Sequence, residues 1–179
     1  MKATGIVRRI DDLGRVVIPK EIRRTFHIKE GDSLEIYTDK DGEVIFKKYS
    51  PMGELSDFSG QICDSLHKTT GRSVAICDRD SVVTAAGSAR RSVTDKRISP
   101  QLEEIMASRG LFTAQDGTTT PVCPDNETPY VSVCAPIIAS GDVMGCVLFI
   151  SEPNDPPCGE TEIKLAQTVA SFLGRQMEE

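Results

Sequence analysis

The sequence predicts an α+β protein built from two domains of different chemistry. The first 29 residues carry eight Lys or Arg against three Asp or Glu, a net charge of +5. From Pro51 onward, ten Lys or Arg face 18 Asp or Glu, a net charge of −8. Short β-branched runs with turn signals fill the first fifty residues, whereas longer helix and strand patterns follow. A basic head on an acidic body is typical of a polyanion-binding module joined to a domain with another task.

Length and composition restrict the remaining classes. A chain of 179 residues with 39% hydrophobic and 27% charged residues is typical of one or two folded, soluble domains. The longest apolar run, Val143–Ile150, is too short to span a membrane, and no apolar signal core follows the N-terminus. Six cysteines without an export signal indicate reduced thiols. We therefore expect a cytoplasmic protein with no membrane partner.

The first fifty residues predict the order strand, strand, helix, strand, strand. Pro19 is favoured in the first turn of a helix, and Ile22 and Phe26 lie four residues apart on one helical face. Asp41-Gly42 is a hairpin signal between two β-branched runs. The expected elements are strands Gly5–Ile10 and Arg15–Ile18 around an Asp11–Gly14 turn, helix Pro19–Phe26, and strands Leu34–Thr38 and Val44–Tyr49.

Such a small unit is not expected to fold alone. Fifty residues usually need a metal, disulfides or a partner subunit. This segment has no cysteine and one histidine, His27, so a metal is not expected. The simplest partner is a second copy, and we predict an obligate homodimer through the N-terminal domain.

The second part predicts a sheet with flanking helices. We place the first domain at residues 1–50, a linker at 51–54 and the second domain at 55–179. Apolar residues at Leu55, Phe58, Ile62 and Leu66 have helical spacing. The further elements expected are strands Ser73–Asp78 and Val82–Ala86, a helix opening at Ser99-Pro100, a long loop Ala114–Pro129, strands Tyr130–Ala139 and Val143–Ser151, and a helix Glu160–Met177.

The final helix carries two apolar stripes. One stripe is sufficient for packing on a sheet, and two indicate burial on both sides. We expect this helix to pack between subunits and to make a homotetramer, the alternative being a helix enclosed in the core of one monomer. The stripes are Ile163, Ala166, Ala170, Leu173 and Met177, and Leu165, Val169, Phe172 and Gln176.

The runs Gly5–Arg23 and Ile28–Ile36 resemble the AbrB-type, swapped-hairpin DNA-binding family. The resemblance implies that hairpins of two subunits interleave into one β-barrel that binds double-stranded DNA. Its DNA-contacting arginines map onto Arg8, Arg15 and Arg23, together with Arg24. The rest of the chain resembles a GAF domain in its order of elements. The whole chain is similar to transcriptional regulators of spore-forming bacteria, which implies activation or repression of sporulation genes.

The residues support the same DNA site. Arg15 follows the Gly14 turn, and Arg23 and Arg24 lie off the Ile22–Phe26 stripe, so these side chains should point outward. Arginine suits bidentate contacts to phosphate and guanine. The alternative is that these cations only solvate a small surface. The expected DNA-binding residues are Arg8, Arg9, Arg15, Lys20, Arg23 and Arg24.

The cysteine spacing argues against a metal centre. No two of the six are separated by only two residues, as zinc and iron–sulfur sites usually require. Cys123 and Cys158 are flanked by proline in loops, and Cys158 precedes the last helix, whose dipole is expected to lower its pKa. A redox-sensing thiol is therefore an alternative. Cys63, Cys77, Cys134 and Cys146 lie in apolar patterns and are expected in the core.

No catalytic residue, metal or cofactor is expected. His67 is the single histidine of the second part, and no nucleophile elbow or phosphate-binding loop appears. The open alternatives are a GAF-type enzyme with a DNA-binding appendage and an antitoxin. A cyclic nucleotide is disfavoured, because no aromatic residue lies between Phe112 and Tyr130. An unknown small molecule could bind between the sheet and the Ala114–Pro129 loop, with Arg90 and Arg91 as candidate contacts for an anion.

Overall fold

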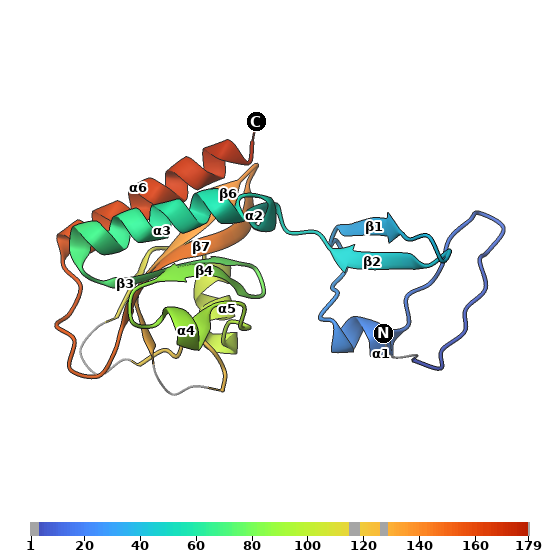
Figure 1. Cartoon of the computed structure of the whole chain (residues 1–179), viewed down its shortest axis with the longest axis horizontal. Helices are drawn as coiled ribbons and strands as arrows, with labels where there is room; N and C mark the ends of the chain where they lie inside the picture. The colour runs from blue at the N-terminus through green and yellow to red at the C-terminus, as the bar shows by residue number, and fades with distance from the viewer. Residues whose placement is uncertain (1–3, 115–118, 126–128, 179) are drawn as a thin grey trace. The chain divides into compact units, whose positions relative to one another are not determined.

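The computed structural model describes residues 4–114, 119–125 and 129–178. The chain divides into two compact units, Met1–Tyr49 and Ser50–Glu179 (Figure 1). The elements are α1 (Lys20–Thr25), β1 (Leu34–Thr38), β2 (Val44–Lys48), α2 (Pro51–Glu54), α3 (Ser56–Thr70), β3 (Ser73–Asp78), β4 (Val82–Ala86), α4 (Arg90–Val93), α5 (Pro100–Ala107), β5 (Phe112–Thr113), β6 (Tyr130–Ala139), β7 (Asp142–Ser151) and α6 (Glu160–Gln176).

The first unit contains one helix and one hairpin. Strands β1 and β2 pair antiparallel, with Ile36 opposite Phe46. Gly42 closes the hairpin with φ +79°, a left-handed value that glycine adopts without steric cost. The predicted hairpin and the helix after Pro19 are therefore confirmed.

The two strands predicted before this helix are wrong for the single chain. Gly5–Ile10 and Arg15–Ile18 form no ladder, although the turn between them closes, with the Gly14 N–H donating to the Asp11 carbonyl at 3.0 Å. A strand requires a neighbour for its backbone groups, and an isolated two-stranded hairpin is marginal in water. Within the described part of this one chain, neither segment has that neighbour.

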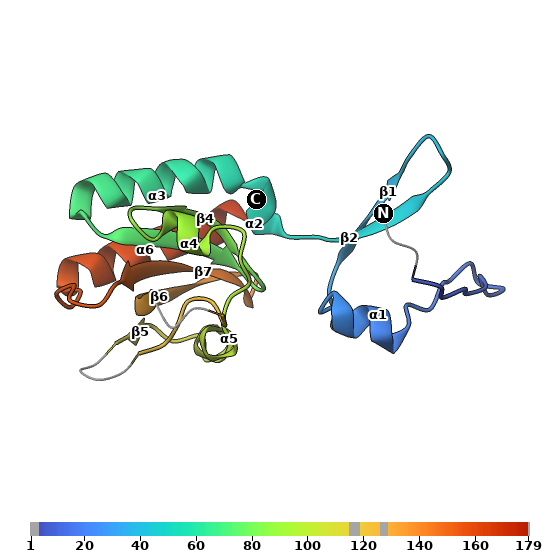
Figure 2. The same ribbon diagram turned by 60° about the horizontal axis from the view of Figure 1, so that its bottom comes forward.

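The second unit is a three-layer arrangement around a five-stranded sheet. The strand order is β4-β3-β7-β6-β5, and every pairing is antiparallel. Helices α3 and α6 lie side by side on one face, and α4 and α5 lie on the other (Figures 1 and 2). The predicted antiparallel sheet with flanking helices is confirmed. The short elements α4 and β5 were not predicted.

Each face of the sheet has its own apolar core. Phe149 and Val147 of β7 pack under α3 and α6, whereas Leu148 and Ile150 pack under α4 and α5. This alternation is the period-two pattern of a strand buried on both faces. Helix α6 approaches β6 so closely at Gly174 that a Cβ at this position would overlap the carbonyl oxygen of Ile138.

Residues 51–54, expected as a linker, form helix α2 of the second unit. Pro51 occupies its first turn, and the Ser50 hydroxyl accepts from the Gly53 N–H at 3.3 Å as its N-cap. Met52 is fully buried in the core beneath α3 and α6. Burial of this one apolar side chain holds the segment against the sheet unit.

Candidate nucleic-acid interface

All the side chains that we expect to contact DNA are exposed on the surface of the first unit. Each lies on an exposed residue, whether on the N-terminal extended segments or on α1. Exposure suits phosphate contact, because bound DNA would meet these cations without unfolding the unit. The six residues are Arg8, Arg9, Arg15, Lys20, Arg23 and Arg24.

Asp11 holds Arg15 at the tip of the first turn. Its Oδ1 accepts from the Arg15 backbone N–H at 2.7 Å, and its Oδ2 accepts from the Arg15 Nε at 2.9 Å. These hydrogen bonds lower the pKa of Asp11. The guanidinium has two further nitrogens that can contact phosphate or guanine. This role of Asp11 was not predicted, although its position four residues before an arginine is visible in the sequence.

Helix α1 presents its cations at its C-terminal end. Arg23 and Arg24 lie in its last turn, where positive charge complements the helix dipole. The Phe26 and Ile28 N–H groups cap this turn by donating to the carbonyls of Ile22 and Arg23, at 3.0 Å and 2.8 Å. The helix is therefore closed by its own backbone, and both guanidinium groups remain on the exposed side.

An ion pair fixes the connection behind α1. The Asp32 side chain is 4% exposed, and its Oδ2 lies 3.1 Å from the Lys48 Nζ and accepts from the Lys29 N–H at 2.7 Å. The end of β2 is thereby held to the turn that follows the helix. Lys48 has a structural role here that distinguishes it from the exposed cations of the first 24 residues.

The first unit also exposes an unusual amount of apolar surface. No residue among 4–49 is buried, and Val7 and Val17 are 85% and 71% exposed. So many exposed apolar side chains on a unit of this size indicate an interaction surface. We name this set the head apolar surface: Ile6, Val7, Ile10, Leu13, Val16, Val17, Phe26, Ile36, Tyr37, Val44, Ile45, Phe46 and Tyr49.

The second unit has an apolar face on its two long helices. The rings of Phe58 on α3 and Phe172 on α6 lie 5.8 Å apart, centroid to centroid, and are 37% and 44% exposed. Leu165 and Val169 are half-buried beside them. Of the two predicted stripes on α6, the first is buried in the monomer through Ala166, Ala170 and Leu173, and the second remains partly exposed.

The thiols of the second unit are less reactive than predicted. Burial raises the pKa of Cys158, outweighing the hydrogen bond with Ser132 and the charge of Arg72. The predicted lowering of this pKa by the helix dipole is therefore wrong. Cys123 is buried, and desolvation raises its pKa as well. Burial raises the pKa of Cys63 to about 12 and that of Cys146 well above its ordinary value.

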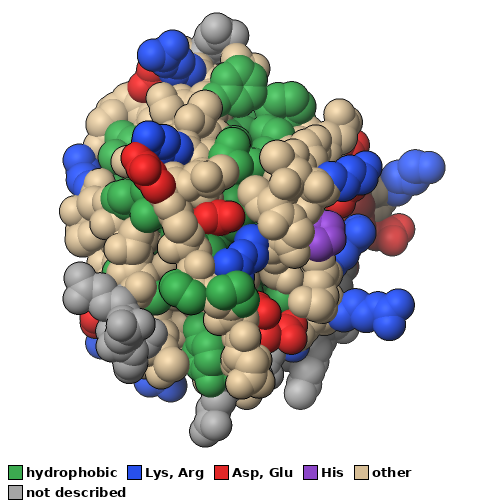
Figure 3. Space-filling model, turned by 90° about the vertical axis from the view of Figure 1, so that its left-hand side faces the viewer, with side chains coloured by type: hydrophobic (Ala, Val, Ile, Leu, Met, Phe, Trp, Pro, Cys, Tyr) green, Lys and Arg blue, Asp and Glu red, His purple; other side chains and the backbone are tan. Residues whose placement is uncertain are grey.

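The other candidates of the sequence analysis occupy ordinary positions. His67 Nδ1 lies 2.7 Å from the Arg72 carbonyl oxygen and joins the end of α3 to β3. Arg90 and Arg91 are exposed on α4. Charged side chains of both signs surround apolar ones on the face shown in Figure 3. Across residues 4–114, 119–125 and 129–178, no cluster of His, Cys, Asp or Glu is arranged to hold a metal. No helix in these ranges is long and apolar enough to cross a membrane.

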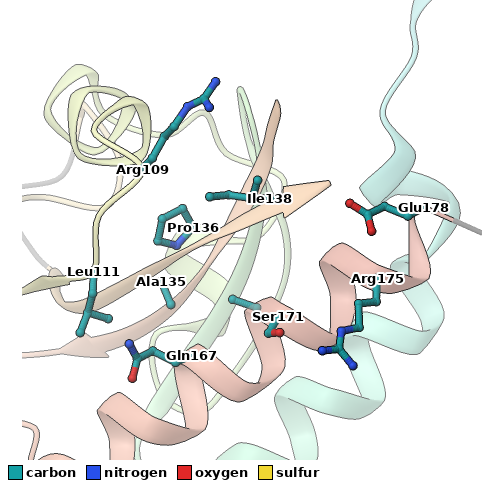
Figure 4. Close-up of a pocket in the computed structure, with 10 residues that line it drawn as sticks. Arg109, Leu111, Ala135, Pro136, Ile138, Gln167, Ser171, Arg175 and Glu178 are labelled. Carbon is teal, nitrogen blue, oxygen red and sulfur yellow. The ribbon is translucent and has the colours of Figure 1, made fainter. Parts of the chain in front are cut away.

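A groove of about 390 Å³ lies between α6 and β6 (Figure 4). Ala135, Pro136 and Ile138 of β6 form one wall, and Gln167 and Ser171 of α6 form the other. The chain after α5 contributes Arg109 and Leu111. The groove therefore lies at the β6 edge. Much of the expected site beside Ala114–Pro129 falls on residues 115–118 and 126–128, outside the described residues.

A basic, exposed head attached to an acidic sheet-and-helix unit defines the class of two-domain DNA-binding regulators. Residues 54–178 match the family described as Stage V sporulation protein T C-terminal, transcription factor, and residues 7–53 match the family described as antidote-toxin recognition MazE, bacterial antitoxin. The chain is 49% identical over 180 residues to Stage V sporulation protein T of Bacillus subtilis (strain 168), and the match covers 100% of both chains. This chain belongs to the Stage V sporulation protein T family.

Two further comparisons concern the separate units. Over 63 residues, 32% of this chain and 65% of the relative, the chain is 59% identical to the transition state regulatory protein AbrB of the same organism. The crystal structure of a GAF domain/HD domain protein from Geobacter sulfurreducens matches with a TM-score of 0.52 at 16% identity, covering 74% of this chain and 99% of that one. That likeness shows a GAF-like fold for the second unit, as predicted.

Proposed function

We propose that this protein regulates transcription of sporulation genes by binding double-stranded DNA through its N-terminal unit. The exposed set of Arg8, Arg9, Arg15, Lys20, Arg23 and Arg24 is the observation that carries the proposal. The description of the family as a transcription factor supports it. The net charge of −8 beyond residue 50 would hold the second unit away from DNA and leave the head to engage it. Such a protein acts in the cytoplasm, on the chromosome.

The head is expected to act as a homodimer. Without a buried residue in 4–49, its side chains leave apolar surface in water that only a partner can cover. The extended segments Gly5–Ile10 and Arg15–Ile18 also offer backbone groups for pairing with a second copy. A two-fold dimer doubles the cationic set and suits pseudo-symmetric DNA.

The salt dependence of DNA binding tests this function. Fluorescence anisotropy on a duplex, repeated from low to high salt, measures the slope of log K against log salt. Replacing Arg15 by Ala removes one phosphate contact per subunit, so the slope of a dimer should become shallower by about 2. Lys40→Ala is the matched control, because Lys40 is an exposed cation on the β1–β2 turn outside the proposed site.

Two results would count against the proposal. If the wild-type chain does not bind duplex DNA at about 50 mM salt, where non-specific contacts are expected, the head is not a DNA module. If Arg15→Ala and Lys40→Ala change the slope equally, the cations act only through net charge, and the assigned residues are incorrect.

We further propose that the second unit joins two such dimers into a tetramer through α3 and α6. The exposed Phe58–Phe172 pair supports this, because the second stripe of α6 continues it through Leu165 and Val169. The occupant is a second copy of the same face, since a two-fold contact places identical apolar patches against each other. The two dimeric heads of one tetramer would gain avidity on paired DNA sites.

Sedimentation velocity of Phe172→Glu tests the tetramer. A charge buried at this contact should yield a species of half the wild-type mass, while binding to a single DNA site persists. Gln167→Glu places the same charge on the groove side of α6 and should leave the mass unchanged. An unchanged mass for Phe172→Glu would exclude this face as the contact.

The competing functions have less support. The antitoxin family matches only residues 7–53, whereas residues 54–178 match a transcription-factor family. An enzymatic or redox role needs an activated group, and the four thiols whose pKa shifts, Cys63, Cys123, Cys146 and Cys158, all shift upward. We propose a protein without catalysis. If the second unit senses a small molecule, the groove beside α6 has a volume suited to it.

A further inference from the structure

The second unit is tied down at its first residues. Ser50 directly follows Tyr49, the last residue of the head, and its hydroxyl donates to Asp78 Oδ2 at 2.9 Å. The same hydroxyl caps α2 by accepting from the Gly53 N–H. Two residues later, Met52 is fully buried. The point at which the head is attached is thereby fixed to the β3–β4 end of the sheet.

Asp78 uses its other oxygen to close the turn between β3 and β4. Its Oδ1 accepts from the backbone N–H groups of Asp80 and Ser81 at 2.8 Å and 2.7 Å, and from the Ser81 hydroxyl at 3.2 Å. One carboxylate therefore fixes both the turn and the attachment point. A change in the turn that moves this carboxylate would alter its hydrogen bond to Ser50.

Backbone hydrogen bonds also join this turn to the segment between α4 and α5. The Ile98 N–H donates to the Asp80 carbonyl at 3.0 Å, and the Val82 N–H donates to the Lys96 carbonyl at 2.8 Å. Ile98 is buried in the core beneath α4 and α5. The hydrogen-bonded connection thus passes from the attachment point to the opposite face of the sheet.

Ser99 extends the connection to the loop that precedes β6. Its N–H donates to the Val122 carbonyl at 2.8 Å, and its hydroxyl donates to the Pro121 carbonyl at 2.6 Å. The hydroxyl also accepts from the Leu102 N–H at 3.1 Å as the N-cap of α5, and Ser99 is fully buried. Hydrogen bonds, joined through the backbone of Asp80 and of Ile98-Ser99, thus connect the loop and α5 to the turn and the attachment point.

We propose that Asp78 is a positioning residue through which the α4–α5 face and its loop control how firmly the DNA-binding head is attached. The bistable element is α2, docked when Ser50 bonds Asp78 and frayed when it does not. A perturbation at Ser99 is felt at Ser50, because each intervening bond constrains the next. The regulatory meaning rests on the proposed DNA-binding function, whereas the coupling itself does not.

Hydrogen exchange of the full-length protein tests the coupling. Ser50→Ala removes the near end of the connection and should accelerate exchange in residues 50–56 about two- to ten-fold, the effect of losing one hydrogen bond. Ser99→Ala removes both hydroxyl bonds at the far end and should accelerate exchange in the same residues, while 143–150 of β7 are unchanged. Combining the two substitutions should add little further acceleration at the junction.

Ser88→Ala is the matched control, because it removes a serine–carboxylate hydrogen bond of 3.0 Å to Glu152 Oε1 outside this connection. It should leave residues 50–56 unchanged. The proposal fails if Ser50→Ala accelerates the junction but Ser99→Ala does not. If Ser99→Ala accelerates β7 as well, Ser81→Ala weakens the middle of the connection by removing the hydroxyl bond to Asp78 Oδ1, and it decides the result in the same way.

Anisotropy of the same variants on a single duplex separates the two proposals. A wild-type chain that fails to bind DNA overturns the proposed function and leaves the exchange result to judge the coupling. If the wild-type chain binds DNA but neither Ser99→Ala nor Ser81→Ala accelerates exchange in residues 50–56, only the coupling is overturned.

Discussion

Replacing Gly174 by Ala should destabilise the second unit, although a Gly-to-Ala change inside a helix usually increases stability. In an exposed helix interior this change gains about 1 kcal/mol from propensity. Here the new methyl group would overlap the carbonyl oxygen of Ile138, a backbone atom that cannot rotate away. Helix α6 would have to move off β6 and loosen the packing of Leu173. Overpacking of this kind costs about 1–3 kcal/mol, which offsets the gain and leaves an expected net loss of up to about 2 kcal/mol.

Urea unfolding followed by far-ultraviolet circular dichroism measures the change in the full-length protein. Gly60→Ala on α3 is the matched control, because its Cβ would meet only the Thr84 Oγ1 at 3.6 Å, an ordinary contact. That variant should gain about 0.5–1 kcal/mol. If Gly174→Ala is as stable as the wild type or more so, α6 does not approach β6 as closely as described, and the reasoning fails.

The remaining predictions concern the thiols. Burial raises the pKa of Cys63 from its ordinary 9.0 to about 12. The buried neutral thiol therefore contributes its full stability below pH 9. This contribution is lost as the pH rises toward 12, at about 1.4 kcal/mol per pH unit. Urea unfolding at pH 8 and pH 10.5 should show a smaller loss for Cys63→Ala than for the wild type, and an equal loss would contradict this. Treatment with iodoacetamide at pH 8 should label Cys158 first, because it alone of the six is not fully buried. Mass spectrometry showing Cys146 labelled as quickly would refute that ordering.

Local patterns were sufficient for the hairpin after α1 and for the boundaries of α3 and α5. The hairpin of β1 and β2 is readable from alternation and the Asp41-Gly42 turn. Gly71, with φ +72°, ends α3 where the apolar pattern stops, and Ser99 caps α5 by accepting from the Leu102 N–H. These signals act over four or five residues, so sequence alone contains them.

The remaining features depend on parts of the structure that local patterns do not describe. Gly5–Ile10 has strand composition, but no strand in the described part of the chain pairs with its backbone. The upward pKa shift of Cys158 results from burial by the surrounding fold, which overrides the helix end nearby. Helix α2 depends on a deep pocket for Met52 that no pattern around Pro51 reveals. The DNA-contacting role of the exposed arginines stays a prediction, since exposure permits contact without demonstrating it.

The proposed pairing of the head, in which no apolar residue among 4–49 is buried, has a consequence for how the protein responds to its own concentration. A domain that completes its core only by pairing folds in proportion to how often two chains meet, so its population rises with the square of concentration at low abundance. Newly made chains would then remain exposed to proteases until enough copies accumulate. In a cell committing to a new developmental programme, such a head would convert a gradual rise in synthesis into a steeper rise in occupied DNA.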